Sequence, residues 1–580
     1  MNGMSERAQS GTVASYLVAR LEELGIEHLF NVSGSYCSGL LAEVAESPGL
    51  KAVFTTYEME AAYAADAYAR IKGYGAMCST YGVGALSALN GVVGAFVERC
   101  PIIVINGGPS SKQLDLEIEY GIMFLHSTGP LKTDLTIYSQ VTAATAVIER
   151  AEEAPDKIDE VLIACMTRRR PVYLEISQDL WAQPCPMPVG RLSAAAAPVN
   201  PDSLAECLDD AVARLGAAHS PLLWAGEEID RWQLHDELAL LLRVSGAPYV
   251  TTLAGKSVLP ETTTGFLGVY DGRFATSDLQ EFVEKADFVV ALGTTITDFV
   301  GDIVTRDYGR MILASQGGVR IGHHVYPDVN LREFVVGLTQ RLGRHAAASP
   351  WATAPHHRPG ASAVSSGDAA ITFDLLFARI SHFVQGKLVI ADTGLSMFAS
   401  AGLPISEQQA YLSQSIWMSI GYSLGASVGA ACAGSKRPVV FVGDAAFREG
   451  PQALSTLVQY NLPAVICVMN NGIMGIQQFM GHPQYYEGAG GQPDYYNVLR
   501  RWDYGSLARA FGARHARART VGELDTALRE AAELADGPIL IDVVLDEKDI
   551  PAVIRRAIGR TAPETVQANF EAPLLRPTVS

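Results

Sequence analysis

Short apolar runs alternate with longer helical patterns along most of the chain, which predicts parallel β-sheets covered by helices. The clearest runs are "KAVFTT", "PIIVINGG" and "PVYLEIS" in the first third, and "PLLWAG", "APYVTT" and "DFVVALG" in the middle. The last third contains "KLVIADTG", "PVVFVGD", "PAVICVMNN" and "PILIDVVL". Most runs end in Gly, Asp, Asn or Thr, as strands do when ligands bind at their carboxyl ends. The sequence therefore predicts three doubly wound α/β domains in series.

Two segments of different composition separate these blocks. "AQPCPMPVGRLSAAAAPVNP" begins at Ala182 and "RHAAASPWATAPHHRPGASAVSSGD" spans 344–368. Both are rich in proline and small residues, as linkers are. They predict domains over 8–184, 198–345 and 368–558, followed by an irregular C-terminal tail over 559–580.

Composition and charge indicate which class of protein this is and which partners are not expected. The 48% hydrophobic and 18% charged residues are typical of a soluble α/β enzyme. A net charge of -18 disfavours binding to nucleic acid. The eight cysteines include no C-x-x-C pair, the N-terminus resembles no export signal, and no run of about 18 apolar residues is present. We therefore expect a cytoplasmic protein with neither nucleic acid nor membrane as a partner.

The segment "GDAAFREGPQALSTLVQYNLPAVICVMNN" carries candidate metal ligands. Asp444 ends one predicted strand and Asn471 ends the next, so their oxygens can converge beside one crevice. With the backbone carbonyl of Ile473 they form a ligand set suited to Mg²⁺, which can in turn neutralise a diphosphate. The alternative is that Gly-Asp and Asn-Asn are ordinary turns.

A second segment, "TTYEMEAAYAADAYARIKGYGA", places Glu58 at the start of a helix rich in small residues. An acidic residue at this place can also simply stabilise the helix dipole, a role that suits Glu60. The neighbouring "YGVGALSALNG" resembles a dinucleotide loop, but Ser87 stands where the third glycine is needed, so a nicotinamide site is not expected.

Together these segments resemble the thiamine diphosphate enzymes over nearly the whole chain, especially the pyruvate and indolepyruvate decarboxylase branch of the acetolactate synthase and carboligase superfamily. The resemblance implies pyrimidine-binding, central and diphosphate-binding domains in that order, with thiamine diphosphate and Mg²⁺ as cofactors. Glu58, before "ADAYAR", matches the glutamate that contacts N1′ of the aminopyrimidine and helps the 4′-imino group take the proton from thiazolium C2. The central domain is expected to be structural.

The resemblance implies further cofactor contacts. "ADTG" looks like the family's "AETGD" loop, with Leu395 in place of the usual Asp. In "IWMSIGYSLGASVGA", Ile420 matches the residue that wedges between the cofactor rings, and the Met418 carbonyl matches the group that holds the 4′-amino group. The complete implied set is Glu58, Thr393, Gly394, Leu395, Met418, Ile420, Gly443, Asp444, Ala445, Ala446, Asn471, Ile473 and Met474, with Asp444, Asn471 and Ile473 as metal ligands.

This chain departs from the family at the residues that handle protons. Simple decarboxylases of this branch use an Asp in a "GDYN"-like loop, an adjacent His-His pair and a Glu after the "NN" strand. Here Ser35 stands in "GSYC", Leu125 and His126 in "FLHSTG", and Gln477 in "NNGIMGIQ". Ser and Gln orient a substrate but donate no proton near neutral pH. His126 remains as a proton carrier, unless it is a hydrogen-bonded structural residue.

We therefore predict a carboligase, in which the enamine formed from a 2-keto acid outlives its protonation and attacks a second carbonyl compound. Its catalytic residues are Glu58, Ser35, His126 and Gln477, with Gln478 also near the pocket. The pocket is expected to be apolar because of Leu125, Leu395, Met474 and Met480. The alternatives are a simple decarboxylase that releases an aldehyde, a flavin-dependent oxidase, and a silent cofactor-binding paralogue.

The resemblance also implies an oligomer. In the family, the glutamate matched by Glu58 approaches the metal and diphosphate held by another subunit. A homodimer or homotetramer with active sites at the subunit interfaces is therefore expected, with a 2-keto acid donor and a carbonyl acceptor as the small-molecule partners.

Overall fold

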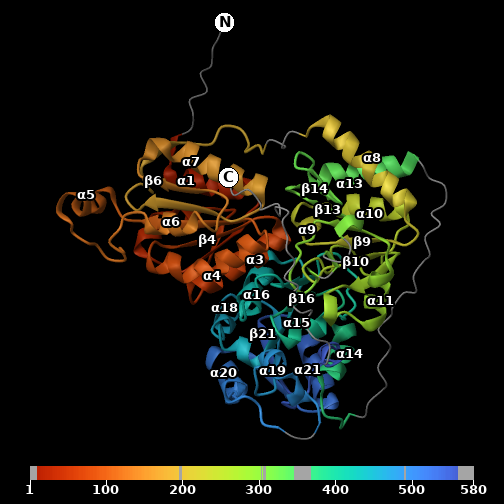
Figure 1. Cartoon of the computed structure of the whole chain (residues 1–580). Coiled ribbons are helices and arrows are strands. Elements are labelled where there is room, and N and C mark those ends of the chain that lie inside the picture. The colour runs from red at the N-terminus through yellow and green to blue at the C-terminus, as the bar shows by residue number, and fades with distance from the viewer. Residues whose placement is uncertain are drawn as a thin grey trace.

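The computed structural model describes residues 10–194, 199–301, 303–304, 308–344, 367–488 and 491–558. The expected tail over 559–580 lies outside the described residues, as do 195–198 of the first expected linker and 345–366 of the second. Figure 1 shows three α/β units, with the N-terminal unit at upper left, the central unit at upper right and the C-terminal unit below them. The predicted α/β class with three sheet domains is confirmed.

The first domain contains a six-stranded sheet in the order β3-β2-β4-β5-β7-β6, parallel throughout. Its strands are β2 His28–Asn31, β3 Lys51–Phe54, β4 Gly75–Thr80, β5 Ile102–Gly108, β6 Thr145–Ile148 and β7 Val172–Ser177. Its helices are α1 Val13–Glu23, α2 Ser38–Glu46, α3 Glu58–Lys72, α4 Val83–Val97, α5 Ser111–Tyr120, α6 Thr133–Tyr138 and α7 Ala154–Arg168. An antiparallel pair, β1 Ser10–Thr12 and β8 Pro184–Pro186, joins the two ends of this unit.

Both faces of this sheet are covered, which explains why its strands are almost continuously apolar. In β5, Ile102 and Val104 join the core beneath α3 and α4, whereas Ile103 and Ile105 join the core beneath α1, α2 and α7. The alternation follows from the two-residue period of a strand.

The central domain has a seven-stranded sheet in the order β11-β10-β9-β12-β13-β14-β15. Its strands are β9 Pro221–Ala225, β10 Tyr249–Thr251, β11 Phe266–Val269, β12 Phe288–Leu292, β13 Met311–Ser315, β14 Gly318–Ile321 and β15 His324–Tyr326. Its helices include α8 Pro201–Ala217, α9 Glu228–Arg231, α10 His235–Ser245, α11 Ser277–Lys285 and α13 Leu331–Arg344. The last two strands are antiparallel, unlike the all-parallel sheet that we predicted. A two-residue turn over 316–317 joins β13 to β14 and reverses the chain. Gly318, the first residue after the turn, adopts φ 141°.

The third domain has a six-stranded parallel sheet in the order β17-β16-β18-β19-β21-β20. Its strands are β16 Leu388–Ala391, β17 Tyr411–Ser413, β18 Pro438–Gly443, β19 Ala464–Asn470, β20 Arg514–Ala518 and β21 Pro538–Val544. Its helices are α14 Phe373–Phe383, α15 Leu395–Ser400, α16 Tyr422–Ala433, α17 Asp444–Phe447, α18 Ala453–Gln459, α19 Gly475–Gly481, α20 Tyr504–Phe511, α21 Val521–Glu533 and α22 Ala552–Ala557.

Helices α3 and α16 join the first and third domains (Figure 1). Their small residues allow a close approach, since a Cβ at Gly429 would overlap the carbonyl oxygen of Ala64. One hydrophobic cluster consequently runs from Ala61 and Tyr63 to Leu424 and Val428. None of the helices in the described part of the chain is both long and apolar enough to cross a membrane.

Candidate functional site

The third sheet has a switch point between β16 and β18. These neighbours are the second and third of the six strands, and the chain leaves them in opposite directions, to β17 and to β19. In open α/β sheets, ligands bind in the crevice at such a point, beyond the carboxyl ends of the strands. Thr393 and Gly394 follow β16, and Asp444 follows β18. The geometry therefore brings these predicted residues to one edge of the sheet.

Asp444 is a buried carboxylate with few partners. Its side chain is 2% exposed and accepts hydrogen bonds from the backbone N–H groups of Gly472 at 2.7 Å and Ala445 at 2.9 Å. Burial nevertheless raises its pKa to about 6. No salt bridge to Asp444 occurs within the described ranges, so its charge is one that a bound cation would compensate.

Asn471 and Ile473 lie beside Asp444 because Gly472, which binds the Asp444 carboxylate, sits between them. Both are buried, and Asn471 Oδ1 accepts a hydrogen bond from the Ile473 N–H at 3.3 Å. One carboxylate, one amide and a backbone carbonyl fit Mg²⁺, which binds few protein ligands and keeps several waters. The described residues contain no group of three or more His, Cys, Asp or Glu that could hold a metal.

Arg501 supports this loop and was not identified from the sequence. Its guanidinium donates to the carbonyls of Asn470 and Asn471, both at 2.9 Å, and to that of Leu545 at 3.3 Å. It thereby fixes the end of β19, on which Asn471 depends. Its position in "LRRWDYG" resembles any exposed basic pair, so no sequence signal distinguishes it.

Met418 adopts a strained backbone conformation, with φ 58°. This left-handed region is unfavourable for residues other than glycine and is found mostly where the surroundings enforce it. On one side, Glu98 Oε1 accepts hydrogen bonds from Ile416 N–H at 2.7 Å and Trp417 N–H at 3.2 Å. On the other, Gln414 Oε1 accepts from Ser419 N–H at 3.1 Å. The carbonyl of Met418 is therefore rigidly oriented, and Ile420 follows it, packed against the core shared by the two domains.

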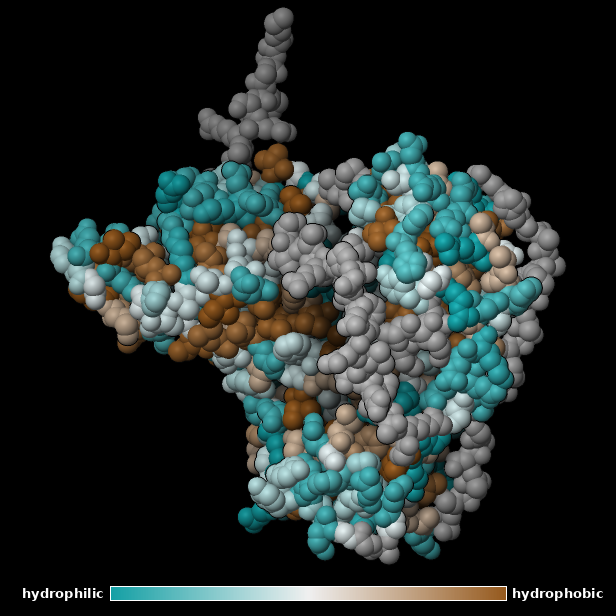
Figure 2. Space-filling model, viewed as in Figure 1, coloured by the Kyte–Doolittle hydropathy of each residue, from teal (hydrophilic) through white to brown (hydrophobic). Residues whose placement is uncertain are grey.

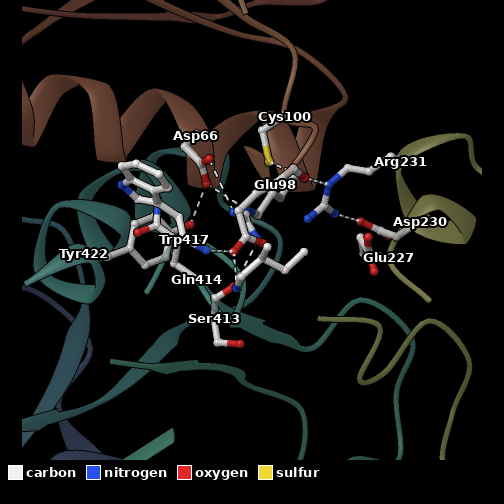
Figure 3. A network of polar contacts seen from close by, with 12 residues as sticks. Asp66, Glu98, Cys100, Glu227, Asp230, Arg231, Ser413, Gln414, Trp417 and Tyr422 are labelled. Atoms are coloured by element: carbon white, nitrogen blue, oxygen red, sulfur yellow. Dashed lines mark hydrogen bonds and ion pairs between the residues drawn. The ribbon is translucent and has the colours of Figure 1, made fainter. Parts of the chain in front are cut away.

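Figure 3 shows that residues from all three domains meet at this segment. Arg70 from α3 forms an ion pair with Asp66 at 2.6 Å and donates to the Ser413 carbonyl at 3.1 Å. Arg231, at the end of α9 in the central domain, donates to the Glu98 carbonyl at 3.0 Å. These charges were missed by the sequence analysis, because charged helical residues are usually solvated and only the packing of the domains buries them.

Asp392 is a second carboxylate whose role was missed, although its motif "ADTG" was identified. It is fully buried and accepts hydrogen bonds from Gly421 N–H at 3.0 Å and Ser423 N–H at 2.9 Å, at the start of α16. Burial raises its pKa to about 6. Asp392 thus links the end of β16 to the segment that contains Met418 and Ile420. An acidic residue directly after a wholly apolar strand is the signal that could have identified it.

Leu395 begins α15 after Gly394, which has φ 117°. Its side chain is 7% exposed and lies against α19, where its Cδ1 would be 2.6 Å from a Cβ at Gly475. Met474, before α19, is half-buried. The buried Leu395 side chain therefore stands where the "AETGD" loop of the resembled family has its Asp.

Glu58 begins α3 and is half-buried, and its carboxylate forms no hydrogen bond or ion pair with the described residues. Glu60 differs, because it is 1% exposed and accepts hydrogen bonds from the N–H of Thr56 at 3.0 Å and from the Thr56 hydroxyl. Burial raises the pKa of Glu60. Glu60 thus supports the turn before α3, whereas Glu58 remains available to a ligand.

Ser35 and His126 both lie beside Tyr36 in the first domain. Ser35 is exposed at the start of a short 3-10 helix, Ser35–Cys37. His126 is also exposed, and its ring lies 5.9 Å from the ring of Tyr36 and 6.0 Å from that of Tyr81.

Gln477 is exposed on α19 in the third domain. Gln478 is buried and accepts hydrogen bonds from Asp494 N–H at 2.9 Å and Asn497 Nδ2 at 3.1 Å, so it faces the protein interior rather than a pocket. Within the described part of one chain, no hydrogen bond or ion pair joins Ser35, Glu58 or His126 to Asp444 or Asn471. The candidate residues therefore form two groups, one in the first domain and one in the third.

Comparisons with known proteins show which family the chain resembles. Three family models match: the N-terminal TPP binding domain of thiamine pyrophosphate enzymes over residues 11–131, the central domain over 208–336, and the C-terminal TPP binding domain over 392–543. The chain is 30% identical over 563 residues to an alpha-keto-acid decarboxylase of Mycolicibacterium paratuberculosis, which covers 95% of this chain and 97% of the relative. Relatives of the same name from Mycobacterium leprae and Mycobacterium tuberculosis are also 30% identical, over 96% and 95% of this chain and 96% and 98% of their own lengths. The chain belongs to the thiamine pyrophosphate enzyme family.

Proposed function

We propose that this protein is a thiamine diphosphate- and Mg²⁺-dependent carboligase. It decarboxylates a 2-keto acid and transfers the acyl unit to a second carbonyl compound. The names of its relatives support the decarboxylation step. The observation that carries the transfer step is the chemistry of Ser35 and Gln477, which are exposed but supply only a hydroxyl and an amide. With no acidic side chain at these two positions, protonation of the donor carbon would be slow, and that carbon could bond to an acceptor carbonyl instead.

The third domain supplies the groups that bind. Asp444, Asn471 and the Ile473 carbonyl hold Mg²⁺, and the segment from Gly443 to Ala446 lies along the diphosphate. Thr393, Gly394, Leu395 and Met474 line the same crevice. Met418 would hold the aminopyrimidine of thiamine diphosphate with its carbonyl, and Ile420 would support the cofactor with its side chain. Once bound, thiamine diphosphate supplies the electron sink that makes decarboxylation possible.

The groups that handle protons and substrate come from two domains: Glu58, Ser35 and His126 from the first, and Gln477 from α19 of the third. Glu58 hydrogen-bonds the aminopyrimidine ring and sets its protonation. Ser35 and Gln477 orient the carbonyl groups of the two substrates. His126 delivers a proton to the oxygen of the acceptor as the new carbon–carbon bond forms. Leu125 and Met480, 79% and 51% exposed, favour an apolar acceptor.

We propose a homodimer or homotetramer in the cytoplasm, with each active site between subunits. Helix α4 supports this assembly, because its sequence "VGALSALNGVVGAFV" has no charge over 15 residues and it exposes Val83 (57%) and Leu86 (38%). Figure 2 shows a hydrophobic band where α3 and α4 lie. Such a face is typical of a subunit interface. Glu58 begins α3 beside it.

The flavin-dependent alternative is less well supported. The switch point of the central sheet lies between β9 and β12, where a dinucleotide would bind. Two buried glutamates, Glu227 and Glu228, follow β9 at this point. Glu227 accepts hydrogen bonds from the N–H and hydroxyl of Thr295, and Glu228 pairs with Arg99 at 2.7 Å and accepts from Gln316 N–H at 2.8 Å.

The test is carbon dioxide release and mass spectrometry on purified protein with thiamine diphosphate, Mg²⁺ and a panel of 2-keto acids, with and without aldehyde or ketone acceptors. Ligated products that depend on the acceptor are expected. Free aldehyde alone would identify a simple decarboxylase. Cofactor binding without turnover of any keto acid would favour a silent paralogue.

A further inference from the structure

We propose that Tyr36 and Tyr81 are positioning residues that hold the His126 ring in place for proton transfer at the candidate site. This proposal rests on the proposed function and extends it to two residues that no motif indicated. Both tyrosines lie at the carboxyl ends of strands in the first sheet, Tyr36 after β2 and Tyr81 after β4.

The three rings form one cluster. Tyr36 and Tyr81 are 5.1 Å apart with an interplanar angle of 79°. The His126 ring lies against Tyr36 at 68° and against Tyr81 at 75°. Edge-to-face contacts of this kind are favourable for aromatic pairs. Tyr36 and Tyr81 are 8% and 7% exposed whereas His126 is exposed, so a rigid buried pair supports a ring that remains accessible to substrate.

The backbone at His126 is held as well. His126 has φ 70°, a conformation that a side chain makes costly and that surrounding contacts must maintain. The Tyr81 hydroxyl donates a hydrogen bond to the carbonyl of Leu125, the preceding residue. A Cβ at Gly82 would overlap the His126 carbonyl oxygen, so only glycine permits this approach.

Two further contacts anchor the support. The Gly82 N–H donates to Asp134 Oδ2 at 2.5 Å, which fixes the turn after β4. Trp181 Nε1 donates to the Tyr36 carbonyl at 2.8 Å, which fixes the turn after β2. Tyr36 directly follows Ser35, so the same anchor determines where Ser35 lies. Tyr36 therefore adjoins both candidate residues: Ser35 precedes it in the chain, and the His126 ring lies against its ring.

The surroundings of His126 explain why it needs this support. Its neighbours Ile122, Met123 and Leu125 are 51%, 67% and 79% exposed, and α5 buries none of its residues. Figure 1 shows α5 projecting from the body of the first domain. A histidine on such a segment would sample many orientations, and proton transfer requires a defined one. Tyr36 and Tyr81 supply that restriction.

The test separates the position of His126 from turnover. The holoenzyme is labelled with ¹³C-histidine, and its NMR spectrum is recorded. The signal of the His126 ring is assigned by its loss in His126→Gln. Tyr81→Leu removes a ring and a hydrogen bond, Tyr81→Phe removes the hydrogen bond alone, and Tyr36→Leu removes the other ring. Tyr138→Phe is the matched control, because its hydroxyl also donates to a carbonyl, that of Ala85 at 2.7 Å, without contacting His126.

We expect the His126 signal to lie away from the position of a free histidine and to move toward it in Tyr81→Leu and Tyr36→Leu, but not in Tyr138→Phe. Turnover should fall about tenfold in the leucine variants and about threefold in Tyr81→Phe, with KM and cofactor affinity unchanged. A free-histidine signal in the wild-type protein, or a moved signal with unchanged turnover, would overturn the proposal. If the wild-type protein forms no ligated product, the proposed function fails, while the spectrum still decides whether the tyrosines hold His126.

Discussion

The first and third sheets have the same strand order but different chemistry at their switch points. Counted within each domain, both run second, first, third, fourth, sixth, fifth. In the third sheet, the two strands that flank the switch point are followed by buried carboxylates, Asp392 and Asp444. The first sheet ends the equivalent strands near Ser35 and Tyr81, with His126 above them.

This difference shows what the topology does and does not determine. The strand order produces a crevice at the same place in both sheets, since neighbouring chains leave in opposite directions. The residues that follow the strands decide whether the crevice attracts a cation and a diphosphate or presents aromatic rings and a histidine. A binding half and a proton-handling half are the roles that we propose for them.

Glu58→Gln should produce the largest effect if the first domain handles protons. Turnover is expected to fall by about 100- to 10,000-fold, because the amide cannot exchange a proton with the aminopyrimidine. Steady-state kinetics and calorimetry would measure turnover and binding, and Mg²⁺ and cofactor affinity should change little. Glu60→Gln is the control, since Glu60 accepts hydrogen bonds from the N–H and hydroxyl of Thr56, which an amide oxygen can also accept. Full turnover in Glu58→Gln would refute the role.

Asp444→Asn should weaken cofactor binding more than it slows turnover at saturating cofactor, which is the opposite of Glu58→Gln. The reason is that we assign cofactor binding to the third domain. Loss of the carboxylate is expected to lower the affinity for Mg²⁺ and thiamine diphosphate by about 100-fold, measured by calorimetry. Turnover should recover partly at saturating cofactor. The exposed Asp536→Asn controls for a change of net charge. Unchanged affinity in Asp444→Asn would remove it from the metal site.

Asp392→Asn, also in the third domain, should weaken cofactor binding less than Asp444→Asn does. An amide oxygen can accept the hydrogen bond of Gly421 N–H or of Ser423 N–H, but its NH₂ group faces the other donor, at a cost of about 1–3 kcal/mol. We expect roughly tenfold weaker cofactor binding and a lower melting temperature, measured by calorimetry and thermal denaturation. If both quantities stay at wild-type values, the segment at Met418 is held without Asp392.

Glu175→Gln should have the smallest effect on function, because Glu175 lies away from the switch points. It tests how a buried carboxylate changes the stability of the first domain with pH. Glu175 accepts a hydrogen bond from the Tyr173 hydroxyl at 2.7 Å, and burial raises its pKa to about 7 from a usual 4.5. Because the pKa is raised in the folded protein, the contribution of Glu175 to the free energy of unfolding is fully present below pH 4.5. This contribution is lost as the pH rises through about 7. Relative to wild type, the variant should gain on the order of 3 kcal/mol between pH 4.5 and 8. Thermal denaturation of both proteins at several pH values would measure this gain, and parallel curves would contradict it.

Much of the fold could be predicted from the sequence. The apolar runs "PIIVINGG" and "PAVICVMNN" coincide with β5 and β19, because strands covered on both faces must be apolar throughout. Asp444 and Asn471 were identified because strand ends in parallel sheets converge. Glu98, Arg70 and Arg231 were not, since a charged helical residue looks the same in a sequence whether it is solvated or buried between domains.

The sequence by itself determined the three α/β domains, the family and the absence of two acidic groups at Ser35 and Gln477, since all of these depend on local pattern and residue identity. Only the tertiary structure decided which groups support the site. Burial of Asp392, the strained backbone at Met418 and the seating of His126 on Tyr36 and Tyr81 arise from contacts between segments distant in the chain. Such contacts leave no period or motif in the sequence, because packing depends on distance in space and not on separation along the chain.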